Sequence, residues 1–249
     1  MAGHSKWANI KHRKGRQDAL RGKLFAKLAK GIEAAARAGG SDLDSNASLV
    51  QAVAKAKGQS MPNDNIDRAI KRGAGEMGGG AVYDELFYEG YGPGGVAILV
   101  QILTDNRNRA SSDVRVAFTR NGGNLGEPGS VAYLFDQKGL IVMTGDEDEI
   151  MMTALDSGAE DIKESGEGEY EVITDPRDFR AVFNALSDSD QTLVRGEVTM
   201  LPQTNIDLNR EKASTLLRMI EALEDLDDVQ EVYNNGDISD EVMELLAAE

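Results

Sequence analysis

The fold of most of the chain is decided by residues 83–120, YDELFYEGYGPGGVAILVQILTDNRNRASSDVRVAFTR. Apolar and β-branched runs between turn residues predict a strand, a glycine-rich turn and a second strand, at 83–89, 90–95 and 96–103. Helical spacing of the apolar residues from Ala110 to Phe118 predicts a helix over 108–120. The link between the two strands is too short for a parallel crossover, so we expect antiparallel pairing and an α+β fold.

The rest of the C-terminal part continues this alternation of strands and helices. We expect strands at 130–135, 140–144, near 161, at 170–174, 194–202 and 229–234, and helices at 147–157, 177–186 and 209–224 with a short acidic helix at the end. Many of the links are short, so two α+β modules fit this count better than a parallel α/β sheet.

The N-terminal part has a different pattern, with helical spacing only. Leu20, Leu24, Leu28 and Ile32 lie four residues apart and predict a helix with these side chains buried, which ends at the glycines 39 and 40. A second helix is expected over 46–57. Asn63 is expected to cap a third helix that reaches residue 72. Residues 73–80, GAGEMGGG, follow as a linker, so residues 1–76 form a three-helix unit.

Composition excludes several classes of chemistry. The 249 residues include no cysteine, and the two histidines, His4 and His12, lie in the first dozen residues. Disulfides, zinc fingers and thiol nucleophiles are therefore excluded, and histidine-dependent catalysis would have to reside in the first segment. With no signal sequence and no apolar run long enough to cross a membrane, we expect a cytoplasmic protein.

No sequence motif indicates a catalytic or cofactor site. The pattern G-x-G-x-x-G occurs at 73–78 and 90–95, but the first follows a helix and the second precedes a strand, which is the wrong context for a dinucleotide. The acidic runs 146–149 and 224–228 lack the spacing of a calcium loop and are interpreted as solvated helix ends. We expect no enzyme activity, no cofactor, no metal and no small-molecule substrate.

Charge is distributed unevenly along the chain. The net charge is −16, yet residues 1–73 contain 15 lysines and arginines against 6 acids, and the other 176 residues contain 12 against 37. Such a division predicts a basic part that binds an anionic polymer, attached to a body that does not.

Within the basic part, the first helix carries a same-sign face. Lys23, Lys27, Lys30 and Arg37 fall within about 80° on the side opposite the apolar stripe, where we expect them to face solvent and bind phosphates. The tail before this helix adds further candidates for nucleic-acid contact: Lys6, Trp7, Lys11, His12, Arg13, Lys14 and Arg16. Trp7 fits either stacking on a base or packing into the helical unit.

The segment TDNRNR at 104–109 has two interpretations. It is either an elaborate helix cap or a phosphate contact made through Arg107 and Arg109.

Several longer stretches resemble one known family. MAGHSKWANIKHRKGRQDALRGKLFAKLAK at 1–30, MPNDNIDRAIKRGAGE at 61–76, YEGYGPGGVAILVQILTDNRNR at 88–109, NGGNLGEPGSVAYLF at 121–135 and VTMLPQTNIDL at 198–208 resemble the YebC/PmpR family, which includes the mitochondrial translational activator of cytochrome c oxidase subunit I. The likeness runs nearly from end to end.

The resemblance implies an organisation and a function. It implies a helical N-terminal domain at 1–76 and two α+β domains of the ferredoxin-like type, one at 81–134 plus 207–249 and the other inserted at 135–206. It also implies a non-enzymatic regulator of gene expression, a probable DNA-binding transcriptional regulator. The alternative within the same resemblance is a translation factor that binds rRNA or tRNA on the ribosome and relieves stalls on proline-rich stretches.

Overall fold

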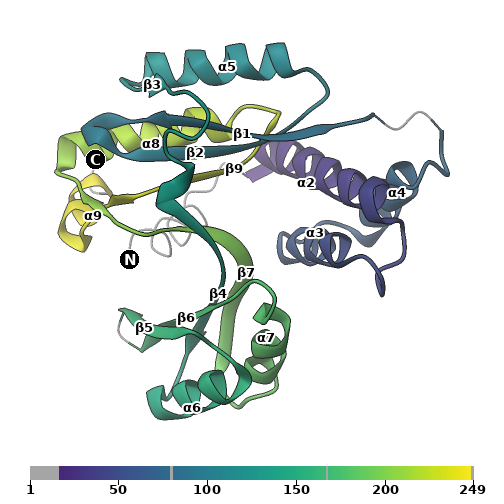
Figure 1. The fold of residues 1–249 in the computed structure, drawn as a ribbon, viewed down its shortest axis with the longest axis vertical. Coiled ribbons are helices and arrows are strands. Elements are labelled where there is room, and N and C mark those ends of the chain that lie inside the picture. The colour runs from purple at the N-terminus through teal and green to yellow at the C-terminus, as the bar shows by residue number, and fades with distance from the viewer. Residues whose placement is uncertain (1–16, 79–80, 167, 248–249) are drawn as a thin grey trace. The chain divides into compact units, whose positions relative to one another are not determined.

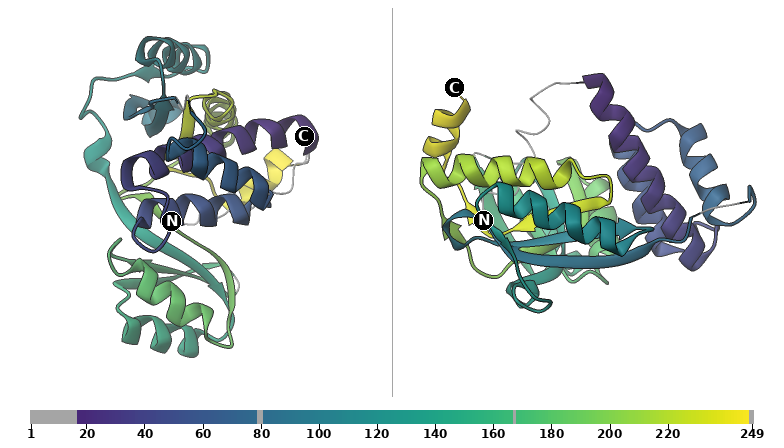
Figure 2. Two further views of the ribbon diagram at one scale, coloured as in Figure 1. Left: turned by 90° about the vertical axis from the view of Figure 1, so that its right-hand side faces the viewer. Right: turned by 90° about the horizontal axis from the view of Figure 1, so that it is seen from above.

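The computed structural model describes residues 17–78, 81–166 and 168–247, and Figures 1 and 2 show their fold. The predicted fold class is confirmed, because a helical N-terminal region precedes two regions built on antiparallel sheets. The described residues divide into two compact units, one with 17–130 and 214–232 and the other with 131–213 and 233–247. The three predicted domains group the chain differently, and their boundaries stay a prediction.

The first unit begins with three helices, α2 (Gln17–Gly39), α3 (Ala47–Gly58) and α4 (Asn63–Gly73). Their shared core consists of small and branched apolar side chains: Leu28, Ile32, Ala36, Leu49, Val53, Ala56, Met61, Ile66 and Ala69. Asn46 joins two of the helices, because its side chain accepts the Leu49 N–H (3.0 Å) and donates to the carbonyls of Ala35 (2.9 Å) and Gly40 (2.8 Å). A single capping residue thus starts α3 and ends α2.

Two details of the predicted helices are wrong. Asn63 is the first residue of α4 rather than its cap, and Pro62 occupies the cap position without a side-chain hydrogen bond. Leu24, predicted to be buried, is 37% exposed, whereas its neighbour Phe25 is partly buried against the core of the three helices. At this turn of α2 the buried face therefore passes through Phe25 and not through Leu24.

The same unit contains a four-stranded sheet in the order β3-β1-β2-β9, formed by β1 (Asp84–Tyr91), β2 (Ala97–Thr104), β3 (Asn124–Leu125) and β9 (Val229–Asn234). β1 and β2 pair antiparallel from Asp84↔Thr104 to Tyr91↔Ala97, with the 3₁₀ helix η1 (Pro93–Gly95) in the turn. β2 is buried along nearly its whole length, as its unbroken apolar sequence predicts.

Two helices cover one face of this sheet, α5 (Arg107–Arg120) and residues 214–224 of α8 (Arg210–Glu224) (Figures 1 and 2). Phe118 of α5 is fully buried against β1 at Gly90, where an added Cβ would lie 2.6 Å from the ring. Met219 of α8 packs near Gly92. The connection from α8 to β9 is the segment 225–228, which lies at the end of the sheet where β2 finishes.

The second unit contains another antiparallel sheet in the order β5-β6-β4-β7. Its strands are β4 (Phe135–Thr144), β5 (Asp161–Gly166), β6 (Glu169–Thr174) and β7 (Thr192–Pro202). Helices α6 (Glu147–Ser157) and α7 (Phe179–Ser187) pack on one face through a core that includes Ile141, Ile150 and Val182. The predicted strand at 130–135 is wrong, because 132–134 form the 3₁₀ helix η2 (Ala132–Leu134) and β4 begins at Phe135.

This unit also contains the parallel pair β8 (Ile206–Asp207) and β10 (Gly236–Asp237), and the helix α9 (Asp240–Ala247). Among the helices of the described residues, none is long and apolar enough to span a bilayer.

Candidate nucleic-acid interface

The predicted interface divides into a part that the structure describes and a part that it does not. The tail candidates Lys6, Trp7, Lys11, His12, Arg13, Lys14 and Arg16 lie outside the described residues. Their role stays a prediction, as do both interpretations of Trp7. The candidates on α2 and at the start of α5 are described.

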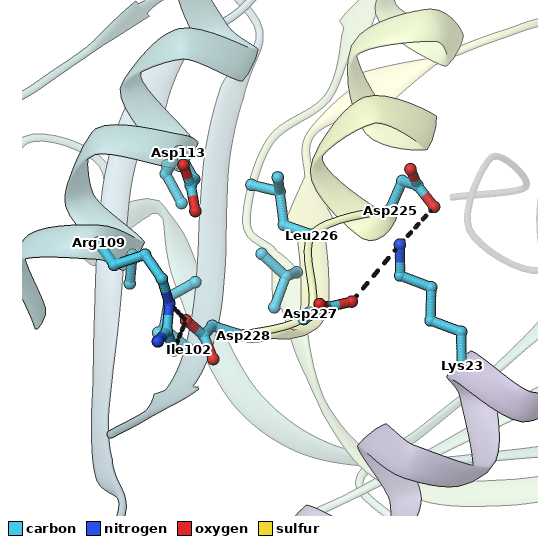
Figure 3. Close-up of a pocket in the computed structure, with 11 residues that line it drawn as sticks. Lys23, Ile102, Arg109, Asp113, Asp225, Leu226, Asp227 and Asp228 are labelled. Carbon is cyan, nitrogen blue, oxygen red and sulfur yellow. Dashed lines mark hydrogen bonds and ion pairs between the residues drawn. The ribbon is translucent and has the colours of Figure 1, made fainter. Parts of the chain in front are cut away.

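The lysines of α2 share one face, as predicted, but this face does not point into solvent. Lys23 Nζ lies 2.8 Å from Asp225 Oδ1 and 3.5 Å from Asp227 Oδ1 (Figure 3). Lys27 Nζ donates to the carbonyl of Glu224 at the end of α8. Lys30 Nζ lies 2.9 Å from Asp228 Oδ1. The expectation of a solvent-facing arc is therefore wrong for these three lysines, because an acidic segment nearly 200 residues away in sequence lies against them.

The interpretation of 224–228 as a solvated helix end is wrong for the same reason. Asp225 and Asp227 are exposed, but each pairs with Lys23, and Asp228 is buried. We call residues 225–228, which follow α8, the acidic segment.

Asp228 is the centre of this contact. Its Oδ1 accepts from Lys30 Nζ, and its Oδ2 accepts from Thr104 Oγ1 (2.9 Å) and from Arg109 Nε (3.2 Å) and Nη2 (2.8 Å). Burial alone would raise the pKa of Asp228, but the hydrogen bonds from Lys30, Arg109 and Thr104 outweigh it and hold this pKa below its ordinary value. Asp228 is therefore an ionised anchor between α2, the end of β2 and the start of α5.

The segment 104–109 adopts the helix-cap geometry, one of its two interpretations. Asn106 accepts the Arg109 N–H through its side chain (3.1 Å) and so caps α5. Arg107 Nε donates to Asp84 Oδ2 (2.7 Å), and the Arg109 guanidinium bridges Asp105 and Asp228. Both arginines keep about half or more of their side-chain surface exposed. A phosphate contact by either of them stays a prediction.

A second basic surface was missed by the reasoning from sequence. Arg68, Lys71 and Arg72 lie on the exposed side of α4, opposite the buried Ile66 and Ala69. Their spacing of three and four residues is the signal that could have identified them. Arg37 at the end of α2 is exposed as predicted.

Arg72 of this surface is also paired, with Glu33 of α2. Arg72 Nη2 lies 2.7 Å from Glu33 Oε1. Burial raises the pKa of Glu33, and the nearby cations Arg72, Arg37 and Lys30 only partly offset this shift. Arg37, Arg68 and Lys71 are exposed cations of the described helical part, as are Arg21 and Lys57.

The acidic segment borders a small pocket of about 190 Å³, lined among others by Lys23, Arg109 and Asp113 (Figure 3). Of its charged lining residues, Lys23 pairs with Asp225 and Asp227, and Arg109 pairs with Asp228. Across the described parts of the chain, no cluster of three or more histidines and acids is arranged to hold a metal ion. The interactions that the structure shows in this region are ion pairs and hydrogen bonds between charged groups.

Together these features define a class of protein: a basic helical region joined to two α+β regions with antiparallel sheets. Two family models match the chain, "TACO1/YebC protein N-terminal domain" over residues 5–76 and "TACO1/YebC second and third domain" over residues 83–236. The chain belongs to the TACO1/YebC family, as its sequence resemblance implied.

Similar proteins align with this chain over nearly its full length. A "probable transcriptional regulatory protein" of Parafrankia sp. is 54% identical, with the whole of both chains covered, and one of Desulforapulum autotrophicum is 52% identical over 99% of this chain and all of the other. The crystal structure of a conserved hypothetical protein from Aquifex aeolicus is similar, with a TM-score of 0.79, 41% identity and coverage of 91% of this chain and 95% of that one.

Proposed function

We propose that this protein is a non-enzymatic regulator of gene expression that binds DNA through its basic helical part. The observation that carries the proposal is the concentration of lysines and arginines on α2 and α4, against a strong excess of acids in the rest of the chain. The names of its relatives support a role in transcription.

The chemistry of these cations favours contact with phosphates. A lysine ammonium is a point charge that binds a phosphate without reading the base sequence, and each phosphate that it neutralises releases counterions. The acids of the remaining chain repel a polyanion, so only the helical part and the start of α5 can approach it closely. We therefore expect an affinity for nucleic acid that depends steeply on salt concentration. These cations do not read the base sequence, so sequence specificity has to come from other residues.

Fluorescence anisotropy of the full chain with a labelled 20-bp DNA duplex tests the proposal. About four to eight phosphate contacts predict a log–log salt slope of about −3 to −7. Replacing Lys23, Lys27 and Lys30 together by glutamine should weaken binding about 10- to 100-fold near 0.15 M salt, since each lost contact forfeits its counterion release. Glutamine is preferred to glutamate, which would face Asp225, Asp227 and Asp228 directly.

A matched control removes the same charge elsewhere. Lys138, Lys163 and Arg180 lie in the second unit, and the two lysines are paired with Glu160 and Asp161. Their replacement by glutamine should change affinity less than about twofold, because they lie on a strongly acidic part of the chain. Equal losses for the two triple variants, or no binding by the native chain even at low salt, would refute the proposal.

The phosphate chemistry alone does not distinguish DNA from RNA. The same titration is therefore repeated with an RNA hairpin that has the same number of phosphates. Tighter binding to the duplex supports a regulator of transcription. Tighter binding to the hairpin would refute the DNA assignment and favour the alternative, a factor that acts on ribosomal RNA.

A further inference from the structure

The acidic segment and a bound nucleic acid would compete for the same atoms. A lysine Nζ has three N–H donors. Lys30 uses all three, because its Nζ donates to Asp228 Oδ1 (2.9 Å), the Asp227 carbonyl (3.2 Å) and the Leu103 carbonyl (3.3 Å). Lys30 therefore has no donor left for a phosphate while this contact persists.

The other two lysines are engaged in a related way. Lys23 faces the carboxylates of Asp225 and Asp227, and the hydrogen bond that it donates to Asp225 is the main reason that the pKa of Lys23 lies above its ordinary value. Lys27 donates to the last carbonyl of α8. The oxygens around these three ammonium groups occupy the positions that phosphate oxygens would need.

We propose that the acidic segment is an internal competitor that covers the basic face of α2, and that a nucleic acid gains this face only by displacing it. This inference rests on the proposed function and names how that site is regulated. The measured affinity for nucleic acid then contains the free energies of two exchanges. Phosphates replace the carboxylates as partners of the lysines, and water replaces the lysines as the partner of the carboxylates.

The segment has a weakly held end and a firmly held end. Asp225 and Asp227 have side chains 66% and 84% exposed, and among the described residues both pair with Lys23, so their contact is a surface ion pair that salt and phosphates displace readily. Asp228 is 7% exposed at its side chain and is also held by Arg109 and Thr104. Displacement therefore begins at Lys23, while Asp228 keeps the segment in place on the sheet.

The first test weakens the competitor without touching the lysines. Asp225→Asn with Asp227→Asn in the full chain should tighten binding of the 20-bp duplex about three- to tenfold, because two exposed ion pairs no longer have to be broken. The control Asp148→Asn with Asp156→Asn changes net charge equally, at exposed acids of α6 in the second unit. It should tighten binding less than twofold.

The second test follows the displacement itself. The chain contains no cysteine, so spin labels can be placed at Ala38→Cys on α2 and Glu221→Cys on α8, both exposed positions. Electron–electron double resonance should give one narrow distance distribution for the free protein. Saturating duplex should shift it to longer distances, and the Asp225→Asn/Asp227→Asn background should broaden it before duplex is added.

The outcomes separate the two proposals. Duplex binding with an unchanged label distance, or equal tightening by the segment variant and its control, would overturn the internal competitor and leave the proposed function intact. If neither the native chain nor the Asp225→Asn/Asp227→Asn variant binds the duplex or the RNA hairpin at low salt, the proposed function fails and the competitor fails with it.

Discussion

Replacing Asp228 by alanine should destabilise the first unit by about 3 kcal/mol. The native carboxylate accepts four hydrogen bonds, from Lys30, Thr104 and twice from Arg109. Removal of one partner from a buried ion pair costs about 3–5 kcal/mol, because the remaining charge is left without compensation. Lys30 is largely buried, but Arg109 is half exposed and can be hydrated again, which places the estimate at the lower end of this range.

Differential scanning calorimetry of the full chain measures this loss. For a protein of this size, about 3 kcal/mol corresponds to a Tm lowered by about 6–12 °C in the transition that contains the first unit. Asp227→Ala is the matched control, since Asp227 lies next in sequence but is exposed, and its loss should cost less than about 0.5 kcal/mol. A decrease for Asp228→Ala no larger than that for Asp227→Ala would refute the assignment of Asp228 as the anchor.

Two further predictions concern acid and glycine. The hydrogen bonds to Asp228 outweigh the effect of burial and lower its pKa in the native state. The ionised carboxylate therefore stabilises the native state at any pH above the unfolded pKa of about 3.9. This stabilisation is lost as pH falls through the lower native pKa. The difference in unfolding free energy between the native chain and Asp228→Asn should therefore be constant from about pH 7 to 5 and shrink below about pH 4; a gap that persists at pH 2 would contradict this. Gly31 lies inside α2, and a Cβ added there would meet no atom closer than 3.7 Å, so Gly31→Ala should raise the unfolding free energy measured in urea by about 0.5–1 kcal/mol. A Cβ added at Gly90 would lie 2.6 Å from the Phe118 ring, so Gly90→Ala should lower the same free energy by about 1–3 kcal/mol. Shifts of the same sign for the two variants would contradict the packing described.

Regular elements were predictable where one period dominates the sequence. The apolar run of β2 and the four-residue spacing on α2 and α5 each predict an element that the structure contains. Errors occur at the ends of elements, where the local pattern is weak. Residues 132–134 have strand-like composition but form a 3₁₀ turn before β4, and Leu24 continues the apolar spacing but is exposed.

The candidate site could be predicted only in part, because periodicity assigns residues to a face without saying what that face contacts. The helical positions of Lys23, Lys27 and Lys30 correctly place them together. Their partners lie at the last residue of α8 and just after it, and Lys23 and Asp225 are 202 residues apart in sequence. Local pattern carries no information about a contact of that separation, which depends on β9 returning to the sheet beside β2.

A helix face with charges of one sign can arise for two physical reasons, and the sequence alone does not distinguish them. Like charges at helical spacing repel one another, so they imply a compensating opposite charge, which either a polyanion or an acidic segment of the same chain can supply. In this protein the acidic segment 225–228 lies against the lysines of α2 and supplies that charge. Both origins can apply to the same protein. Exposed carboxylates that form only weak ion pairs compensate the lysines in the free protein and can be replaced by phosphates in the complex. The exposed fractions of Asp225 and Asp227, and not the lysine pattern, are the features that make such an exchange physically possible.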